Sequence, residues 1–413
     1  MRKLFLLVFL IPFLSFGQEV SEVKVKVGGF VKNDMFWDSR NTVSAREGHF
    51  LLFPAAENLD PDGNDLNGAS SFNFLSIQSR LAVNITGAKA LNADISAKIE
   101  GDFFGQLNPN INLFRLRHAY IKMKWTSTEV LLGQYWIPMF VTDCFPGTIS
   151  FNTGVPFQPF GRSPQIRVTQ SMGLAKFIFV ANSQRDYASR GPNPLAPSST
   201  LVSSEFLRNS SIPELSLQVH LKPGDAILFG LGASYKQIVP QTKTSLGYQT
   251  DESVGGYNAF AFLRVNLKPI TIKMQGVYGQ NMPDVLSLGG IAISDSTNVE
   301  KGFVSYTTLN TMSSWIDISS NGKNFQVGVF AGYSQNLGAK DKIVGPKYGL
   351  GTNIASLYRI SPRVSYQVNK LKFALEGEYT NASYGASYDE YGVPQDLNPV
   401  GNLRILFASY FFF

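Results

Sequence analysis

The sequence has a single cysteine, Cys144, and only three histidines among its 413 residues. One cysteine cannot form a disulfide within the chain, and the simplest interpretation is an unreactive thiol. None of the histidines, His49, His118 and His220, has a second ligand at metal-binding spacing, so no zinc site is indicated. Nucleophile-elbow, phosphate-loop and dinucleotide-binding motifs are also missing. We therefore expect neither a cofactor nor a catalytic step.

Long apolar runs are missing as well, apart from one near the amino-terminus. That run covers residues 4–14, follows two basic residues, and precedes the small-residue segment Ser15-Phe16-Gly17. This order is typical of a secretory signal peptide. We predict that residues 1–17 are removed and that residues 18–413 form a single domain. No later stretch reaches the ~20 consecutive apolar residues of a transmembrane helix.

Charged residues are few, at 16% of the chain, and the formal net charge is +6. Two of these positive charges, Arg2 and Lys3, belong to the predicted signal peptide. The remaining excess is too mild to indicate binding to nucleic acid. Aromatic residues make up 13% of the chain and there are 37 glycines, which favours strands and turns over helices.

Segments of alternating apolar and polar residues recur from Val23 to the end of the chain, each about ten residues long. Short turns and long loops strictly alternate between them. An even number of strands with this loop asymmetry is typical of single-chain bacterial barrels. We therefore predict an all-β, antiparallel transmembrane barrel in the bacterial outer membrane, with short periplasmic turns and long extracellular loops. The predicted strands, about sixteen, are 23–38, 73–86, 92–104, 113–125, 129–137, 164–171, 174–183, 213–222, 226–238, 255–267, 270–281, 302–318, 324–336, 353–367, 370–384 and 402–413.

The last eleven residues resemble the carboxy-terminal strand of such barrels. Apolar residues occupy alternate positions, and the chain ends on three phenylalanines. The apolar face would contact lipid, and the aromatic end would lie in the interfacial girdle. The alternative is the closing strand of a soluble sandwich.

Charged residues on the strands identify the face that lines the lumen. An Arg or Lys at mid-membrane depth on the lipid side costs ~2–4 kcal/mol, so the charged face is the inner one. The predicted inner cations are Lys32, Arg80, Lys98, Arg115, Arg117, Arg162, Arg167, Arg264, Lys273, Arg359, Arg363, Lys372 and Arg404. The predicted inner acids are fewer, namely Asp34, Asp94, Glu100, Asp102, Glu214, Glu376 and Glu378. Rings of Arg and Lys favour anions, and guanidinium groups match carboxylates. The alternative is that the arginines only pair with inner acids.

The loop 138–162, which includes Asp143, has four prolines and many aromatic residues but few charges. We predict that this stiff, partly apolar loop folds into the barrel and narrows the lumen. Packing on the rim or on a neighbouring subunit is the alternative. Within 113–125 the alternation slips between Arg117 and Ile121, which indicates either a bulge or a subunit contact.

Three motifs resemble a known family. Leu116-Arg-His-Ala-Tyr120, Leu132-Gly-Gln-Tyr-Trp136 and Arg162-Ser-Pro-Gln-Ile-Arg167 are similar to segments of DcaP-like trimeric outer-membrane porins, and the signal peptide resembles those of Bacteroidota. The resemblance implies a sixteen-stranded homotrimer that admits small negatively charged solutes. It also implies that Arg115, Arg117, Arg162 and Arg167 line the constriction.

Other functions stay open. A barrel enzyme such as a lipase would need a partnered histidine. A secretion component or a hydrophobic-substrate transporter would need an amino-terminal plug, whereas the first predicted strand starts about six residues after the cleavage site. Asp60, Asp62 and Asp65 lie in a loop at calcium-site spacing, but no closing glutamate follows.

Overall fold

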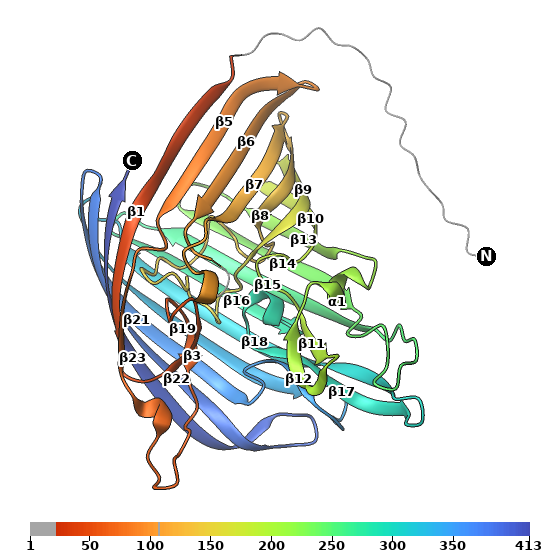
Figure 1. The fold of residues 1–413 in the computed structure, drawn as a ribbon. Coiled ribbons are helices and arrows are strands. Elements are labelled where there is room, and N and C mark those ends of the chain that lie inside the picture. Colours follow the sequence, from red (N-terminus) through yellow and green to blue (C-terminus); the bar gives the residue numbers. More distant parts are fainter. Residues whose placement is uncertain (1–21, 106–107) are drawn as a thin grey trace.

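The computed structural model describes residues 22–105 and 108–413, which leaves the predicted signal peptide outside the described residues. Within the described residues, the chain forms a closed antiparallel barrel of sixteen strands (Figure 1), and the predicted fold class is confirmed. The barrel closes where β1 pairs with β23, from Phe30 opposite Phe412 to Asp38 opposite Arg404.

The wall strands follow the predicted segments closely. In chain order they are β1 (Lys24–Asp38), β5 (Arg80–Ala90), β6 (Ala93–Asp102), β7 (Arg115–Lys124), β8 (Thr128–Trp136), β9 (Arg162–Met172), β10 (Ala175–Asn182), β13 (Glu214–Leu221), β14 (Ile227–Ile238), β15 (Val254–Asn266), β16 (Ile270–Gln280), β18 (Phe303–Ser320), β19 (Phe325–Ala339), β21 (Ile354–Val368), β22 (Leu371–Tyr388) and β23 (Pro394–Phe412).

The long connections contain further elements that alternation did not predict. They are β2 (Thr42–Ala45), β3 (Phe50–Pro54), β4 (Ser71–Leu75), β11 (Arg190–Asn193), β12 (Ala196–Val202), β17 (Gly289–Asn298), β20 (Lys347–Leu350), the helix α1 (Glu205–Arg208) and the 3-10 turns η1 (Leu66–Gly68), η2 (Asn108–Asn110) and η3 (Pro283–Val285). Strands β4, β17 and β20 extend the wall, whereas β2–β3 and β11–β12 are separate hairpins. No helix in the described part of the chain is long and apolar enough to cross a membrane.

The outer face of the barrel is apolar, as the carboxy-terminal strand shows. Leu403, Ile405 and Phe407 are exposed on the outside, whereas Arg404 and Leu406 point inward and are buried. Tyrosines form an outward row near the long-loop ends of the strands. The exposed members of this row are Tyr235, Tyr257, Tyr333, Tyr358 and Tyr379 on β14, β15, β19, β21 and β22, and the half-buried Tyr278 lies among them on β16. An apolar belt bordered by aromatic side chains is the surface that a lipid bilayer requires. With this fold, the protein is located in the bacterial outer membrane.

The irregularity in the 113–125 segment is a β-bulge. Glu100 of β6 lies opposite His118 and Gly101 lies opposite Leu116, which leaves Arg117 as the extra residue on β7. A bulge re-aims the side chains around it. Arg117 and His118, although adjacent in sequence, therefore both point into the barrel and are both buried.

Two predicted segments differ from the structure. The predicted strand 73–86 is interrupted at residues 76–79, and β4 and β5 pair separately with β1. The predicted strand 73–86 also ends too early, because β5 continues to Ala90 past a register shift beside Gly87, and the turn lies at Leu91–Asn92, both with positive φ. The predicted loop 385–401 is mostly strand, because β22 and β23 remain paired as far as Tyr388 and Pro394.

Candidate functional site

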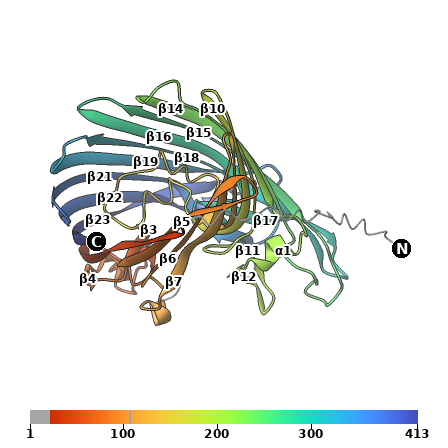
Figure 2. The same cartoon turned by 90° about the horizontal axis from the view of Figure 1, so that it is seen from above.

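A long loop lies inside the barrel. This constriction loop, residues 137–161, leaves β8 and crosses the interior before it joins β9, and Figure 2 shows it within the ring of strands. The backbone N–H groups of Ile149 and Ser150 donate to the carboxylate oxygens of Glu376 at 2.8 and 2.9 Å. The amide of Asn152 donates to Glu378 Oε1 at 2.7 Å. The prediction of an inward loop is confirmed.

Donor side chains of the wall also hold the first half of the constriction loop. Gln218 and Gln275 donate to the carbonyl oxygens of Pro138 and Met139 at 2.8 and 3.0 Å. Arg264 Nη1 donates to the carbonyl oxygen of Asp143 at 3.1 Å, and Lys273 Nζ donates to that of Phe145 at 3.2 Å. The wall therefore satisfies backbone groups that the loop could not satisfy by itself.

The loop and the wall share an apolar core inside the barrel. Phe151, Phe157 and Phe160 of the loop are buried, and so are the inward side chains Phe262 and Phe330 of the wall. The rings of Trp136 and Phe140 stack with centroids 3.9 Å apart. Where the loop covers it, the inner wall therefore carries apolar side chains, although a porin interior is generally polar.

A second inward segment is the hairpin β2–β3, whose position the sequence did not predict. Arg359 donates through Nη2 to the carbonyl oxygen of Leu52 and through Nη1 to that of Val155, both at 2.8 Å. A single buried guanidinium therefore holds both the hairpin and the constriction loop. Arg404 Nη2 donates to the carbonyl oxygen of Gly48 at 2.7 Å.

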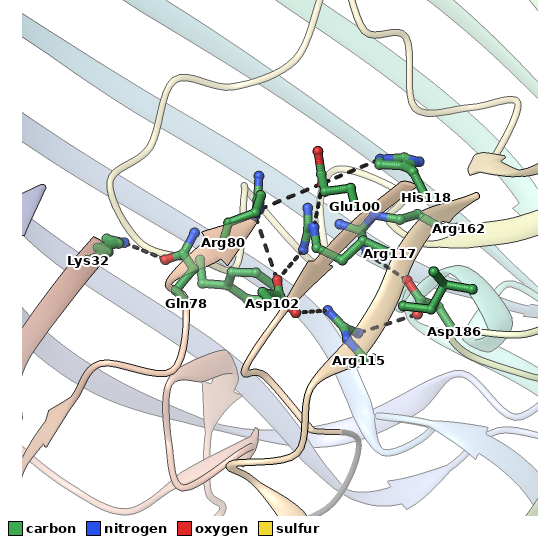
Figure 3. Close-up of polar contacts among 12 residues, drawn as sticks. Lys32, Gln78, Arg80, Glu100, Asp102, Arg115, Arg117, His118, Arg162 and Asp186 are labelled. Atoms are coloured by element: carbon green, nitrogen blue, oxygen red, sulfur yellow. Dashed lines mark hydrogen bonds and ion pairs between the residues drawn. The ribbon is translucent and has the colours of Figure 1, made fainter. Parts of the chain in front are cut away.

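Charged residues from β5, β6, β7 and β9 form a chain of ion pairs, shown in Figure 3. We call this set the arginine cluster. It comprises the cations Arg80, Lys98, Arg115, Arg117 and Arg162, and the carboxylates Glu100, Asp102 and Asp186. Its shortest contacts are Lys98 Nζ to Glu100 Oε2, Arg117 Nε to Glu100 Oε1, Arg117 Nη1 to Asp102 Oδ2 and Arg162 Nη1 to Asp186 Oδ2, each 2.7 Å. Five cations against three carboxylates leave this part of the described interior positively charged.

Asp186 of this cluster lies outside the wall strands, in a loop where no alternation of apolar and polar residues points to it. It accepts from Arg162 and, at 3.3 Å, from Arg115 Nη1. Burial works against its ionisation, but Arg162 and Arg115 outweigh burial and hold the pKa of its carboxyl below the ordinary value. Arg46, at the tip of the β2–β3 hairpin, lies near this cluster with its guanidinium 4.6 Å from the centre of the Phe104 ring.

The predicted pore-lining residues fall into separate groups. Arg80, Lys98, Arg115, Arg117 and Arg162 lie together in the arginine cluster. Arg167 lies beside that cluster and donates to the carbonyl oxygen of Trp136 at 3.0 Å. Arg359 and Arg404 are buried beneath the two inward segments and anchor them. The other predicted cations contact different groups. Arg363 forms an ion pair with Asp317, Lys372 lies over the Tyr410 ring, and Arg264 donates to the carbonyl oxygen of Asp143.

The aspartate loop 60–65 is organised by its own hydrogen bonds. Asp60 Oδ1 accepts from the backbone N–H groups of Asp62 and Asn64 at 2.9 and 2.8 Å. Asp65 Oδ2 accepts from Arg40 at 2.9 Å. Across residues 22–105 and 108–413, no three His, Cys, Asp or Glu side chains gather in a way that could hold a metal ion.

The histidines make contacts of a structural kind. His49 Nε2 lies 2.8 Å from Asp34 Oδ2, and His220 Nε2 lies 2.9 Å from Gln218 Oε1. His118 makes edge-on and tilted contacts with aromatic neighbours, with its ring centre 5.4 Å from that of Trp136, and its Nε2 lies 4.0 Å from Glu100 Oε1.

An apolar furrow of about 710 Å³ lies on the outer wall, across β15, β16, β18, β19 and β21. Small residues, including Ala261, Gly276 and Ser314, form its floor. It faces lipid, so it is not part of a path through the lumen.

The closed barrel, its apolar belt and its inward loop define a porin-like fold. No protein-family model and no curated protein sequence matches the chain. The fold is similar to the outer membrane channel DcaP of Acinetobacter baumannii, with a TM-score of 0.69 and 14% identity, over 95% of this chain and 97% of that chain. It is also similar to an anion-selective porin from Comamonas acidovorans, with a TM-score of 0.54 and 11% identity, over 95% of this chain and all of that one. A third similar structure is the trimer form of OmpT, an outer membrane protein of Vibrio cholerae, with a TM-score of 0.54 and 9% identity, over 95% and 99% of the two chains. At these identities the comparisons establish the fold.

Proposed function

We propose that this protein is a porin, a water-filled channel for the passive diffusion of small hydrophilic solutes through the outer membrane, with a preference for anions. The observation that carries this proposal is the constriction loop held inside a closed barrel by Glu376, Glu378 and Arg359. A loop so firmly anchored narrows the lumen to a defined passage and does not fluctuate freely in it.

The preference for anions is supported by the charge of the interior. The arginine cluster has more cations than carboxylates, and Arg264 and Lys273 donate to carbonyl groups, which leaves their charge uncancelled. Charges in a confined lumen are screened less than charges at an open surface. The similar barrel from Comamonas acidovorans is described as anion-selective, which agrees with this proposal.

The histidine contacts favour the porin over the barrel-enzyme alternative. Their partners in the described residues are two carboxylates, a glutamine and aromatic rings, and none of them contacts a Ser or Thr hydroxyl that it could activate as a nucleophile. The interior also favours a porin over a hydrophobic-substrate transporter. The constriction loop and the β2–β3 hairpin border the arginine cluster, which is strongly charged and unsuited to a hydrophobic substrate.

We further propose a homotrimer. Leu113, Phe114 and Leu116 are exposed on the outside of the barrel beside the β7 bulge, where the wall is irregular. An irregular apolar surface packs better against a second protein surface than against mobile lipid. The trimer form of the similar OmpT barrel agrees with this assembly.

The ion preference is tested by the reversal potential of the purified protein in a planar bilayer under a potassium chloride gradient. We expect chloride to permeate more readily than potassium. A preference for potassium would mean that the acidic side chains Glu100, Asp102, Glu376 and Glu378 set the selectivity, and would refute the anionic version.

A further inference from the structure

The β2–β3 hairpin lies inside the barrel but is not part of its wall. Within the described residues its two strands form a sheet of their own, separate from the barrel. The residues of β3 from Phe50 to Phe53 are buried, and the ring centre of Phe50 lies 5.3 Å from that of Phe151 in the constriction loop. A two-stranded hairpin is marginally stable by itself, so contacts with its surroundings keep it in place. Its departure would break no strand pair of the wall.

Side chains of the wall hold the hairpin at several points. Arg359, Arg404 and Tyr384 donate to backbone carbonyl oxygens of the hairpin at 2.8, 2.7 and 2.5 Å. Arginine and tyrosine ordinarily keep their protons at neutral and mildly acidic pH, so these three contacts do not respond to acid in that range. A fourth contact is different. His49 of the hairpin places its Nε2 2.8 Å from Asp34 Oδ2 of β1, and an imidazole ordinarily titrates near pH 6.5.

The charges around His49 are already balanced without a proton on its ring. Asp34 also contacts Lys32 Nζ, at 2.9 Å. Arg404 of β23, which holds the hairpin next to His49, is paired with Asp38 of β1 at 2.6 Å. Each of the two cations therefore has a carboxylate, and a proton on His49 would add a buried charge with no carboxylate of its own. An unmatched buried charge is strongly destabilising.

Aromatic rings enclose the rest of the imidazole. The ring centre of His49 lies 4.9 Å from that of Phe104 and 5.8 Å from that of Phe151. Arg46, on the hairpin itself, covers the Phe104 ring with its guanidinium. The Nδ1 of His49 is buried and has no hydrogen-bond partner among the described residues. A protonated imidazole has two N–H donors, and this site offers an acceptor to one of them.

We propose that the β2–β3 hairpin is an acid-released plug, which narrows the lumen at neutral pH and leaves the wall when His49 takes up a proton. The hairpin is suited to this role because side chains alone hold it, and one of its contacts titrates. The plug rests on the proposed function, since a hairpin can narrow a passage only in a barrel that conducts.

The direction of the pH response follows from the burial of the ring. Burial outweighs the attraction of Asp34 and holds the pKa of His49 below its ordinary value. A hairpin that has left the wall exposes the imidazole to water, where it titrates near pH 6.5. Below that pH the released hairpin binds a proton that the held hairpin does not, so acid favours release. Above it neither form is protonated, and the contacts hold the hairpin. Between pH 7.5 and 5.5 the released fraction should rise about tenfold.

Hydrogen exchange of the backbone amides of residues 42–54, followed by mass spectrometry of the purified protein, tests release without reference to conductance. Protection is measured against the intrinsic exchange rate at each pH. In the wild type it should fall about tenfold from pH 7.5 to pH 5.5, because exchange reports the released fraction.

Three variants separate the titrating contact from the others. His49→Gln keeps an amide donor for Asp34 but cannot take up a proton, so its hairpin should stay protected at both pH values. Tyr384→Phe removes a contact that does not titrate and should lower protection by the same factor at both pH values, with the tenfold difference retained. His220→Gln, at a histidine of β13 whose ring contacts Gln218, is the matched control and should respond as the wild type does.

Equal protection of the wild type at the two pH values would overturn the proposal. So would a tenfold loss that persists in His49→Gln or disappears in His220→Gln. Bilayer recordings separate this result from the function itself. Single-channel conductance should be larger at pH 5.5 than at pH 7.5 in the wild type and constant in His49→Gln. A wild type that conducts with equal steps at both pH values, although acid releases its hairpin, would refute the plug and leave the channel standing. A hairpin that acid releases in a barrel that never conducts would refute the channel instead.

Discussion

Replacement of Glu376 tests most directly which contacts hold the constriction loop against the barrel wall. Its two carboxylate oxygens accept from the backbone N–H groups of Ile149 and Ser150, and its side chain is almost fully buried. Glu376→Ala leaves both N–H groups without an acceptor. A buried donor without a partner costs about 1–3 kcal/mol, so two of them destabilise the seated loop by about 3 kcal/mol.

The only cysteine of the chain provides the assay, because Cys144 belongs to the same loop. Its thiol is fully buried, and burial raises the pKa of Cys144 to about 11, so the wild type should react slowly with thiol reagents. If the loop leaves the wall as one unit, a loss of about 3 kcal/mol in the free energy that holds it there raises the fraction of molecules with a detached loop about a hundredfold. The rate at which Cys144 is labelled should rise by the same factor. Single-channel currents of the variant should also be larger and noisier.

Asp94→Ala is the matched control, because it removes a carboxylate from the inner face of β6 that does not contact the loop. It should label as slowly as the wild type. Folded Glu376→Ala protein that labels at the wild-type rate and conducts with wild-type steps would refute the anchoring role of Glu376.

Three further expectations concern stability and assembly. Arg404→Met removes the partner of buried Asp38, whose Oδ2 lies 2.6 Å from Arg404 Nη2. The free energy of unfolding in urea should therefore fall by about 3–5 kcal/mol. An unchanged urea midpoint would contradict the stabilising role of this buried pair. Ile405→Arg places a charge on the lipid face, at the position next to Arg404. It should lower the free energy of unfolding by about 2–4 kcal/mol, measured by refolding into bilayers, whereas an unchanged free energy would place this part of the strand at the barrel rim. In a mild detergent, light scattering should give the mass of three chains, and a monomer would count against the trimer.

Alternation alone predicted the wall because the membrane imposes it on every strand. Each strand must place apolar residues toward lipid, and the resulting pattern has a period of two that is visible in each segment. Even Lys236, close to a strand end, points inward, where it pairs with Asp284 of η3. The same reasoning located the irregularity at Arg117, since a bulge changes the parity of the residues that follow it.

The interior was harder to predict because its partners are distant in sequence. The β2–β3 hairpin is inward because of contacts such as Leu52 with Arg359, more than 300 positions away, and local pattern contains no sign of them. On β10 the inner residues Ile178 and Val180 are buried and apolar as well. Both faces of β10 are then largely apolar, so its sequence lacks the alternation that would have assigned Lys176 to the lumen. Asp186 lies in a loop without any periodicity.

Single-channel recording of the purified wild-type protein in a planar bilayer tests the central claim most directly. The account predicts discrete, stepwise increases in current as molecules insert, with steps of uniform size and a reversal potential that favours chloride. An inserted, folded protein that stays silent at every voltage would contradict the assignment of this barrel as a channel.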